Sequence, residues 1–179
     1  MHLKKWGFLA WVALSAVFVD QISKAIIANN LQPNEQWMPI EAIRPYFTLT
    51  YVTNTGAAFG MLPEGGTLFT IVALVVVGVI LYFYRQLPER VWLVRVALGL
   101  QLGGAVGNLI DRIRLGYVVD FLDFKFWPVF NVADSCIVVG VALLIFLMWR
   151  EDRLAASRKK QEQSPANPRT PEDEPSSAG

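Results

Sequence analysis

Ionisable and amide side chains interrupt long apolar runs at several points of this sequence. "FNVADSC", residues 130–136, places Asn131 and Asp134 at the start of the apolar run "IVVGVALLIFLMW", and Asp20 and Lys24 lie near the end of the run that begins at Trp6. Charged groups at membrane depth cost free energy and by default indicate a functional site. The types and positions of these residues therefore limit the chemistry that is open to the protein.

The sequence has few of the residues that metal sites and nucleophilic triads require. A zinc site takes about three or four Cys, His or carboxylate ligands, and a Ser-His-Asp triad needs a positioned His. The chain has one His, His2 near the amino terminus, and one Cys, Cys136, which we expect to be a small apolar residue on a membrane helix. We expect neither a metal nor another cofactor.

Composition indicates a membrane protein. Of the 179 residues, 54% are hydrophobic, and the mean hydropathy is +0.38, which is too apolar for an ordinary soluble domain of this size. The formal net charge is +1, from 16 basic and 15 acidic side chains. A nucleic-acid-binding protein would usually show a basic face, so we expect no nucleic-acid partner.

Four segments are long and apolar enough to cross a hydrocarbon core about 30 Å thick, which takes about 20 helical residues. They are residues 6–27, 67–84, 91–110 and 132–149. Lys and Arg gather before the first segment, between the second and third, and after the fourth, so the positive-inside rule makes these regions cytoplasmic. The expected fold is an all-α membrane protein with four transmembrane helices, both termini in the cytoplasm, and outer loops at residues 28–66 and 111–131.

The two ends of the chain need separate interpretation. "MHLKKWGFLAWVALSAVF" also has the charged start and apolar middle of a secretory signal peptide. No convincing small-residue cleavage site follows, and the helix count and charge bias agree best with a retained helix. Residues 158–179 are rich in Pro, Ser and charge and are expected to form a disordered cytoplasmic tail, which leaves residues 1–157 as the membrane domain.

This topology brings polar side chains from several segments to one outer level. Asp20 and Lys24 lie about 21 to 27 Å along the first helix at 1.5 Å per residue, and their spacing of four puts them on one face. The residues expected at this level are Asp20, Lys24, Asn108, Arg112, Asn131, Asp134 and, from the outer loop, Asp120.

Each of these residues also has a structural explanation. Asn131 fits a helix N-cap, and Asp134 fits a first-turn acid that the helix dipole favours. Asp20 and Lys24 could be a neutralised pair at a helix end, and Arg112 could extend its side chain to the membrane surface. The convergence at one level is what these separate explanations leave unexplained, and it favours a functional site.

Two neighbouring groups are expected to have no part in chemistry. Gly99, Gly103 and Gly107 are spaced by four, which lets another helix approach closely. Asp111 and Arg114 flank Arg112 and are expected to be solvated.

The first outer loop has a β-rich stretch, residues 46–53, followed by an Asn-Thr-Gly turn. We expect a small extracytoplasmic β-rich element here, between the first and second helices. It could be scaffolding, or it could hold an extended peptide by strand addition, with Asn54 as a polar contact near the site.

Five motifs in this order carry a family resemblance: "DQISK" at 20–24, "NTGAAFG" at 54–60, "GGAVGNLIDR" at 103–112, "VVDF" at 118–121 and "FNVADS" at 130–135. Together they resemble the lipoprotein signal peptidase family, also called signal peptidase II, of bacterial inner membranes. The resemblance covers about 115 residues, from the first helix into the fourth. Any one motif would be weak, but five in order on a four-helix frame are specific.

The resemblance implies a multi-pass aspartyl endopeptidase of the inner membrane that works near the extracytoplasmic surface. It implies cleavage of diacylglyceryl-modified prolipoproteins just before the lipidated cysteine, and inhibition by the cyclic peptide globomycin. The family's catalytic pair falls on Asp120 and Asp134. Its supporting residues fall on Asp20, Lys24, Asn54, Asn108, Arg112 and Asn131. The expected partners are these substrates and membrane lipid, with the chain acting as a monomer.

The chemistry of two adjacent carboxyl groups agrees with this role. They cannot both ionise easily, so one keeps a proton while the other accepts one from an attacking water. Asp134 is the expected base because a helix N-terminus favours negative charge. Three rival functions are a transporter with acids along a path, a Ser-Lys peptidase built on Ser23 and Lys24, and a non-enzymatic scaffold.

Overall fold

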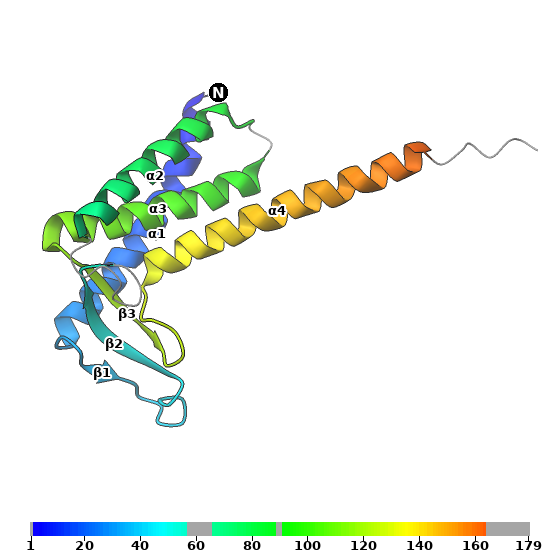
Figure 1. Ribbon diagram of the computed structural model, residues 1–179. Helices are drawn as coiled ribbons and strands as arrows, with labels where there is room; N and C mark the ends of the chain where they lie inside the picture. The colour runs from blue at the N-terminus through cyan, green and yellow to red at the C-terminus, as the bar shows by residue number, and fades with distance from the viewer. Residues whose placement is uncertain (1, 57–65, 89–90, 164–179) are drawn as a thin grey trace, which may run out of the picture. The chain divides into compact units, whose positions relative to one another are not determined.

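A computed structural model describes residues 2–56, 66–88 and 91–163 of the chain (Figure 1). Its helices are α1 (His2–Asn30), α2 (Gly66–Gln86), α3 (Trp92–Leu115) and α4 (Val132–Gln163). Its strands are β1 (Gln36–Trp37), β2 (Phe47–Asn54) and β3 (Val118–Phe124). The chain divides into two compact units, residues 1–145 and 146–179, and the first unit contains the whole sheet.

All four helices are long and apolar enough to span a membrane, within the part of the chain that the structure describes. The predicted four-helix membrane fold is therefore confirmed. The helices extend beyond most of the predicted bounds. α3 continues from 110 to Leu115, and α4 continues from 149 to Gln163, so the first six residues of the predicted tail, 158–163, are helical. The rest of that tail, residues 164–179, lies outside the described residues.

α3 is the most buried of the four spans, and α2 is the most exposed. Small residues let α1 lie directly against α3: a Cβ added at Gly103 would come within 2.6 Å of the Ala16 side chain and 2.7 Å of the Ala13 carbonyl oxygen. A Cβ added at Gly107 would likewise come within 2.6 Å of the Asp20 carboxylate. The predicted packing role of the glycines on this helix is confirmed.

The three strands form one antiparallel sheet in the order β1-β2-β3. The predicted β-rich element between the first two helices is confirmed by β2, which residues 46–53 anticipated, whereas β1 was not predicted. The prediction that residues 111–131 form only a loop is wrong. Within this range, β3 pairs along its length with β2, from Phe47 to Asn54. The sheet packs Tyr51, Val119 and Phe121 against Ile27 of α1, which fixes it to the helices.

A left-handed glycine makes the connection from α3 to β3 possible. Gly116 has φ +80°, and its N–H donates to the Arg112 carbonyl oxygen, which ends α3. Glycine adopts this conformation without steric cost. β3 therefore starts two residues after this turn, and its third residue is Asp120.

Candidate active site

Asn131 and Asp134 form a reciprocal cap at the start of α4. The Asp134 backbone N–H donates to Asn131 Oδ1 at 2.9 Å, and the Asn131 backbone N–H donates to Asp134 Oδ2 at 3.3 Å. The predicted N-cap role of Asn131 is confirmed. The cap leaves Asn131 Nδ2 and Asp134 Oδ1 available for contacts with other elements.

These two remaining atoms connect Asp134 to Asp120 through amides. Asn131 Nδ2 donates to Asp120 Oδ1 at 2.6 Å and to Asn108 Oδ1 at 3.0 Å. Asn108 Nδ2 in turn donates to Asp134 Oδ1 at 2.7 Å. Asn131 therefore contacts both aspartates directly, and Asn108 joins α3 to the same network.

Asp120 lies in the middle of β3 and is only 2% exposed. Its second carboxylate oxygen, Oδ2, accepts a hydrogen bond from Asn54 Nδ2 at 2.8 Å. Burial raises the pKa of Asp120 to about 7, and the Asp134 carboxylate adds to this, against the opposing effect of the amide donors. A carboxyl group in this environment can keep a proton near neutral pH.

A buried ionic layer lies beside the two aspartates. Lys24 Nζ lies 2.9 Å from each of Asp20 Oδ2, Asp111 Oδ2 and Asn108 Oδ1. The predicted pairing of Asp20 with Lys24 is confirmed. Because Asn108 Oδ1 accepts from Lys24, its Nδ2 is directed toward Asp134, so the cation fixes the orientation of this amide.

The prediction that Asp111 is solvated is wrong, because its side chain is buried and Asp111 is only 4% exposed. Besides Lys24, it accepts hydrogen bonds from Gln21 Nε2 at 2.9 Å and from the Val119 backbone N–H at 3.2 Å. Its burial follows from the close approach of α1 to α3 beside Gly107. The spacing of three from Asn108 placed Asp111 on the same helical face and could have revealed this.

Gln21 is a further residue of this layer that sequence reasoning missed. Its Nε2 also donates to the Gly107 carbonyl oxygen at 3.2 Å. Asp20 Oδ1 meanwhile accepts from the Ala133 backbone N–H at 2.9 Å, in the first turn of α4. Asp20 and Gln21 thus bind α1 to α4 and α3 at the depth of the site.

Arg112 interacts with this network through charge rather than through a hydrogen bond, because its guanidinium acts electrostatically on Asp134 and Asp120. Its guanidinium carbon lies 5.7 Å from the centre of the Phe69 ring, and its side chain makes no hydrogen bond or ion pair within the described residues. It lines a cavity of about 390 Å³ together with Thr55, Gly66, Thr67, Thr70, Ile71 and Gly116. Arg112 therefore lines a polar cavity and is close enough to Asp120 and Asp134 for its charge to act on them.

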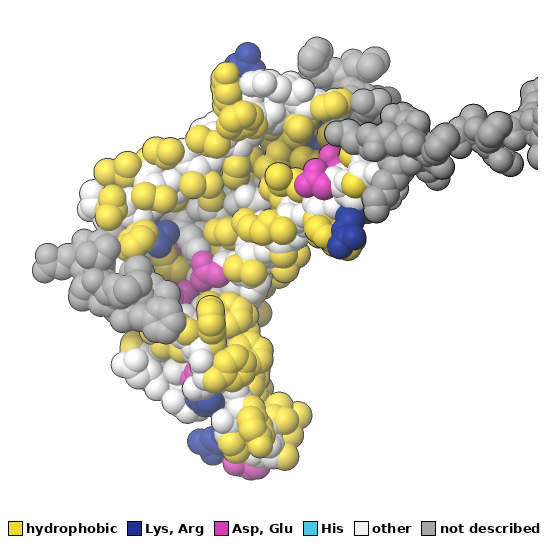
Figure 2. All heavy atoms as spheres, turned by 45° about the vertical axis from the view of Figure 1, so that its right-hand side comes forward, with side chains coloured by type: hydrophobic (Ala, Val, Ile, Leu, Met, Phe, Trp, Pro, Cys, Tyr) yellow, Lys and Arg dark blue, Asp and Glu magenta, His cyan; other side chains and the backbone are white. Residues whose placement is uncertain are grey.

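Asp134 opens onto a different, apolar cavity. This cavity has a volume of about 460 Å³ and is lined by Phe124, Phe126, Trp127, Phe130, Asp134, Ser135, Val138 and Val139. Figure 2 shows acidic side chains in a hollow bordered by apolar ones, between the helices and the sheet. The two aspartates thus differ in access, with Asp120 closed off and Asp134 in a cavity wall.

Among the described residues, no group of three or more His, Cys, Asp or Glu side chains could hold a metal ion. The geometry instead defines a class of protein: a multi-pass membrane protein with two aspartates joined by amides where its helices meet a small sheet. A family model described as "Signal peptidase (SPase) II" matches residues 12–150.

The chain belongs to the signal peptidase II family, which confirms the resemblance and the expectation of an aspartic-type signal peptidase. It is 45% identical over 143 residues to the lipoprotein signal peptidase of Halothermothrix orenii, covering 80% of this chain and 96% of that one. It is 57% identical over 134 residues to that of Caldanaerobacter subterraneus subsp. tengcongensis, covering 74% and 89%. It is thus a multi-pass bacterial membrane protein.

Two solved structures have the same fold. One, described as "Bacterial membrane enzyme structure by the in meso method at 2.3 A resolution", gives a TM-score of 0.75 at 32% identity and covers 82% of this chain and 90% of that one. The other, described in the same words at 1.9 A resolution, gives 0.70 at 34% identity and covers 79% and 92%. The helices and sheet together are therefore similar to those of a bacterial membrane enzyme.

Proposed function

We propose that this protein removes the signal peptide from prolipoproteins whose cysteine carries diacylglycerol, by hydrolysing the peptide bond before that cysteine. Asp120 and Asp134 are the catalytic pair. The observation that carries this assignment is Asn131, which donates its side-chain amide to Asp120 and its backbone N–H to Asp134. Both carboxyl groups are thereby held to one residue at the start of α4.

The two environments divide the catalytic roles. Asp120, whose pKa burial raises to about 7, keeps its proton and donates it to the scissile carbonyl oxygen. Asp134, in the first turn of α4, is the base and takes a proton from the water that attacks the carbonyl carbon. The protonated Asp134 then gives this proton to the departing amine as the C–N bond breaks, while Asp120 takes back a proton from one hydroxyl of the tetrahedral diol as the product carboxyl group forms.

The surroundings suit a substrate that is part peptide and part lipid. The apolar cavity beside Asp134 offers aromatic and aliphatic walls to apolar parts of the substrate. The polar cavity beside Arg112 offers a guanidinium and threonine hydroxyls to carbonyl oxygens of the peptide. Asn54, Asn108, Asn131, Asp20 and Lys24 are supporting residues that position the aspartates.

The proposal includes an orientation in the bacterial inner membrane. The basic residues at the start of α1, around the end of α2 and the start of α3, and late in α4 favour a cytoplasmic position for both termini. The sheet and the aspartates would then face the extracytoplasmic surface, where a lipidated precursor can be met. We propose that the protein acts as a monomer and that globomycin inhibits it, as the family resemblance implies.

One rival from the sequence is disfavoured by the geometry. A Ser-Lys peptidase would need Ser23 to meet Lys24. Instead, Ser23 Oγ donates to the Asp20 carbonyl oxygen at 2.8 Å, and Lys24 Nζ is held by Asp20, Asp111 and Asn108.

The proposal is tested with purified protein, a diacylglyceryl-modified prolipoprotein and the same precursor without lipid, all in the presence of a chelator. We expect cleavage of the lipidated precursor only, and loss of cleavage in Asp134→Asn. Asp152→Asn, a change at an exposed acid of α4, is the control and should cleave as the wild type does. Normal cleavage by a folded Asp134→Asn variant would refute the assignment.

A further inference from the structure

Two buried cations lie at the end of the helices away from the sheet. Lys5 of α1 and Arg95 of α3 are 6% and 7% exposed. Both face the ring of Tyr84 of α2, with Lys5 Nζ 5.5 Å and Arg95 Cζ 5.9 Å from its centre. Thirteen residues, about 20 Å of helix, separate Arg95 from Asn108, so this cluster is no part of the candidate active site.

Lys5 and Tyr84 are fixed by contacts with backbone. Lys5 Nζ donates to the carbonyl oxygens of Arg85 at 2.8 Å and Leu87 at 2.6 Å, where α2 ends. The Tyr84 hydroxyl donates to the Lys5 carbonyl oxygen at 2.7 Å. Within the described residues, no Asp or Glu forms an ion pair with Lys5 or Arg95. The cluster therefore carries two positive charges without an acidic partner there.

Arg95 is the residue whose hydrogen bonding is incomplete among the described residues. Its Nε and Nη2 are buried and have no hydrogen-bond acceptor in the part of the chain that the structure describes. A buried guanidinium left in this way is costly, so an acceptor from beyond the described residues is expected. Arg95 also lies in the first turn of α3, where Val91 provides no side-chain cap and the positive end of the helix dipole adds to the charge.

We propose that Lys5, Tyr84 and Arg95 form a binding site for the phosphate group of an anionic phospholipid. The planar guanidinium donates two parallel hydrogen bonds that match phosphate oxygens. The site lies at the ends of three helices that are long and apolar enough to span a membrane, and basic pockets between such helix ends bind acidic headgroups. The long side chain of Arg95 can extend from its helix toward the layer of lipid headgroups.

A free inorganic anion is the less suitable ligand. Trp6, Leu87 and other apolar side chains pack around Tyr84, and these surroundings suit the acyl chains of a lipid but offer nothing to a free ion. A lipid phosphate already lies at this boundary. In the orientation proposed above, the lipid belongs to the cytoplasmic leaflet, but phosphate binding itself does not depend on the proposed peptidase activity.

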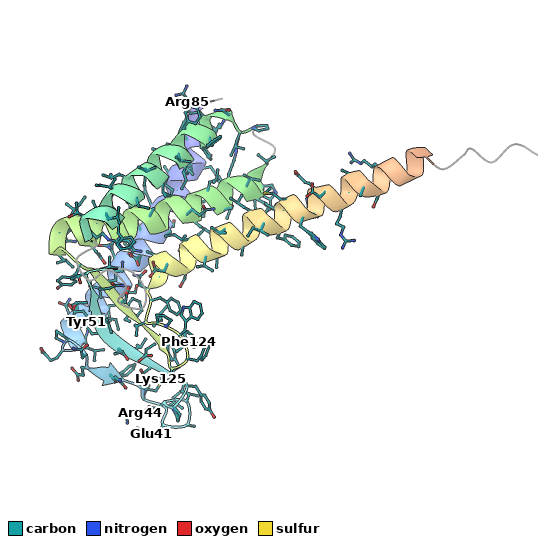
Figure 3. The ribbon with its side chains drawn as sticks, viewed as in Figure 1. Glu41, Arg44, Tyr51, Arg85, Phe124 and Lys125 are labelled. Atoms are coloured by element: carbon teal, nitrogen blue, oxygen red, sulfur yellow. The ribbon has the colours of Figure 1, made fainter. Side chains whose placement is uncertain are left out.

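The test compares lipid binding in detergent by native mass spectrometry, with phosphatidylglycerol and phosphatidylcholine of the same acyl chains. The wild type should bind phosphatidylglycerol about tenfold more tightly, because the positive charge of choline offsets the phosphate of phosphatidylcholine, and Arg95→Gln should lose this preference. Arg85→Gln is the matched control, because Arg85 is an exposed cation at the same end of the helices (Figure 3), and it should stay within about twofold of the wild type.

Thermal unfolding separates lipid binding from a purely structural role of Arg95. Phosphatidylglycerol should raise the Tm of the wild type and leave that of Arg95→Gln unchanged. If Arg95→Gln does not fold, Arg95→Lys, which keeps the charge and loses the guanidinium fork, should show a reduced preference. Equal binding of both lipids by the wild type, or equally tight binding of inorganic phosphate alone, would overturn the proposal.

Discussion

Asp120 and Asp123 lie three residues apart on β3, so they face opposite sides of the sheet and have contrasting surroundings. Asp123 Oδ2 accepts hydrogen bonds from Lys125 Nζ at 2.6 Å and from the Thr50 hydroxyl at 2.7 Å. Although burial opposes them, these hydrogen bonds lower the pKa of Asp123. Among the described residues, Asp120 accepts hydrogen bonds from the neutral amides of Asn54 and Asn131 and from no cation, and burial raises its pKa to about 7.

The difference shows how one strand supports two kinds of carboxyl group. A carboxylate in contact with an ammonium group stays charged and contributes to stability. A carboxyl group held by amides in a closed pocket is positioned without being neutralised, so it can gain and lose a proton. Lys24 contacts the catalytic pair only through Asn108. Lys24 Nζ donates to Asn108 Oδ1, and Asn108 Nδ2 donates to Asp134.

The largest expected effect on stability is at Lys24. Lys24→Met would leave Asp20 and Asp111 as uncompensated buried charges and should lower the free energy of unfolding by about 3–5 kcal/mol. Lys125→Met is the matched control at Asp123, and this more exposed pair should lose about 1 kcal/mol or less. Chemical unfolding in detergent measures the stability of both variants. Equal losses of stability would mean that the Lys24 and Lys125 ion pairs contribute equally to the fold.

Asn131→Ala should mainly affect catalysis. It removes the amide that binds Asp120 and the cap of α4, so we expect about a 100-fold loss in cleavage rate and about 1 kcal/mol in stability. Asn30→Ala, at an exposed asparagine that bonds only the Ile26 carbonyl oxygen, is the control and should change neither quantity. A normal rate in folded Asn131→Ala would mean that the aspartates do not need this link.

Asp123→Asn should show the reverse pattern. It weakens the contact with Lys125 and should cost about 1 kcal/mol of stability at neutral pH, with a cleavage rate within about threefold of the wild type. Thermal unfolding and an activity assay on the same preparation test this. A large loss of activity without a loss of stability would place Asp123 in the catalytic machinery.

The contributions of Asp120 and Asp123 to stability should change in opposite directions with pH. The pKa of Asp120 rises from 3.8 to about 7 on folding, so its stabilising contribution is complete below about pH 4 and is lost as pH rises through about 7. The lowered pKa of Asp123 gives a contribution that is present above about pH 4 and is lost below it. The Tm of Asp120→Asn relative to the wild type should therefore increase between pH 4 and pH 8. A constant difference would contradict the raised pKa.

The sequence was sufficient for the parts of the structure that depend on local pattern. Apolar run length predicted the four helices, the spacing of four predicted the Asp20–Lys24 pair, and the position of Asn131 before an apolar run predicted a cap. It was not sufficient for β3, whose partner β2 is distant in the chain, so Asp120 was assigned to a loop. Asp111 was predicted to be solvated because its burial depends on the approach of another helix.

The most direct test of the account is the cleavage rate of lipidated prolipoprotein by wild type, Asp120→Asn and Asp123→Asn at pH 6, with Tm measured on the same samples. The account predicts a loss of about 1,000-fold or more for Asp120→Asn with the fold retained, and a rate within about threefold of the wild type for Asp123→Asn. Substantial cleavage by folded Asp120→Asn, or equal losses in both variants, would contradict the assignment of Asp120 as a catalytic acid.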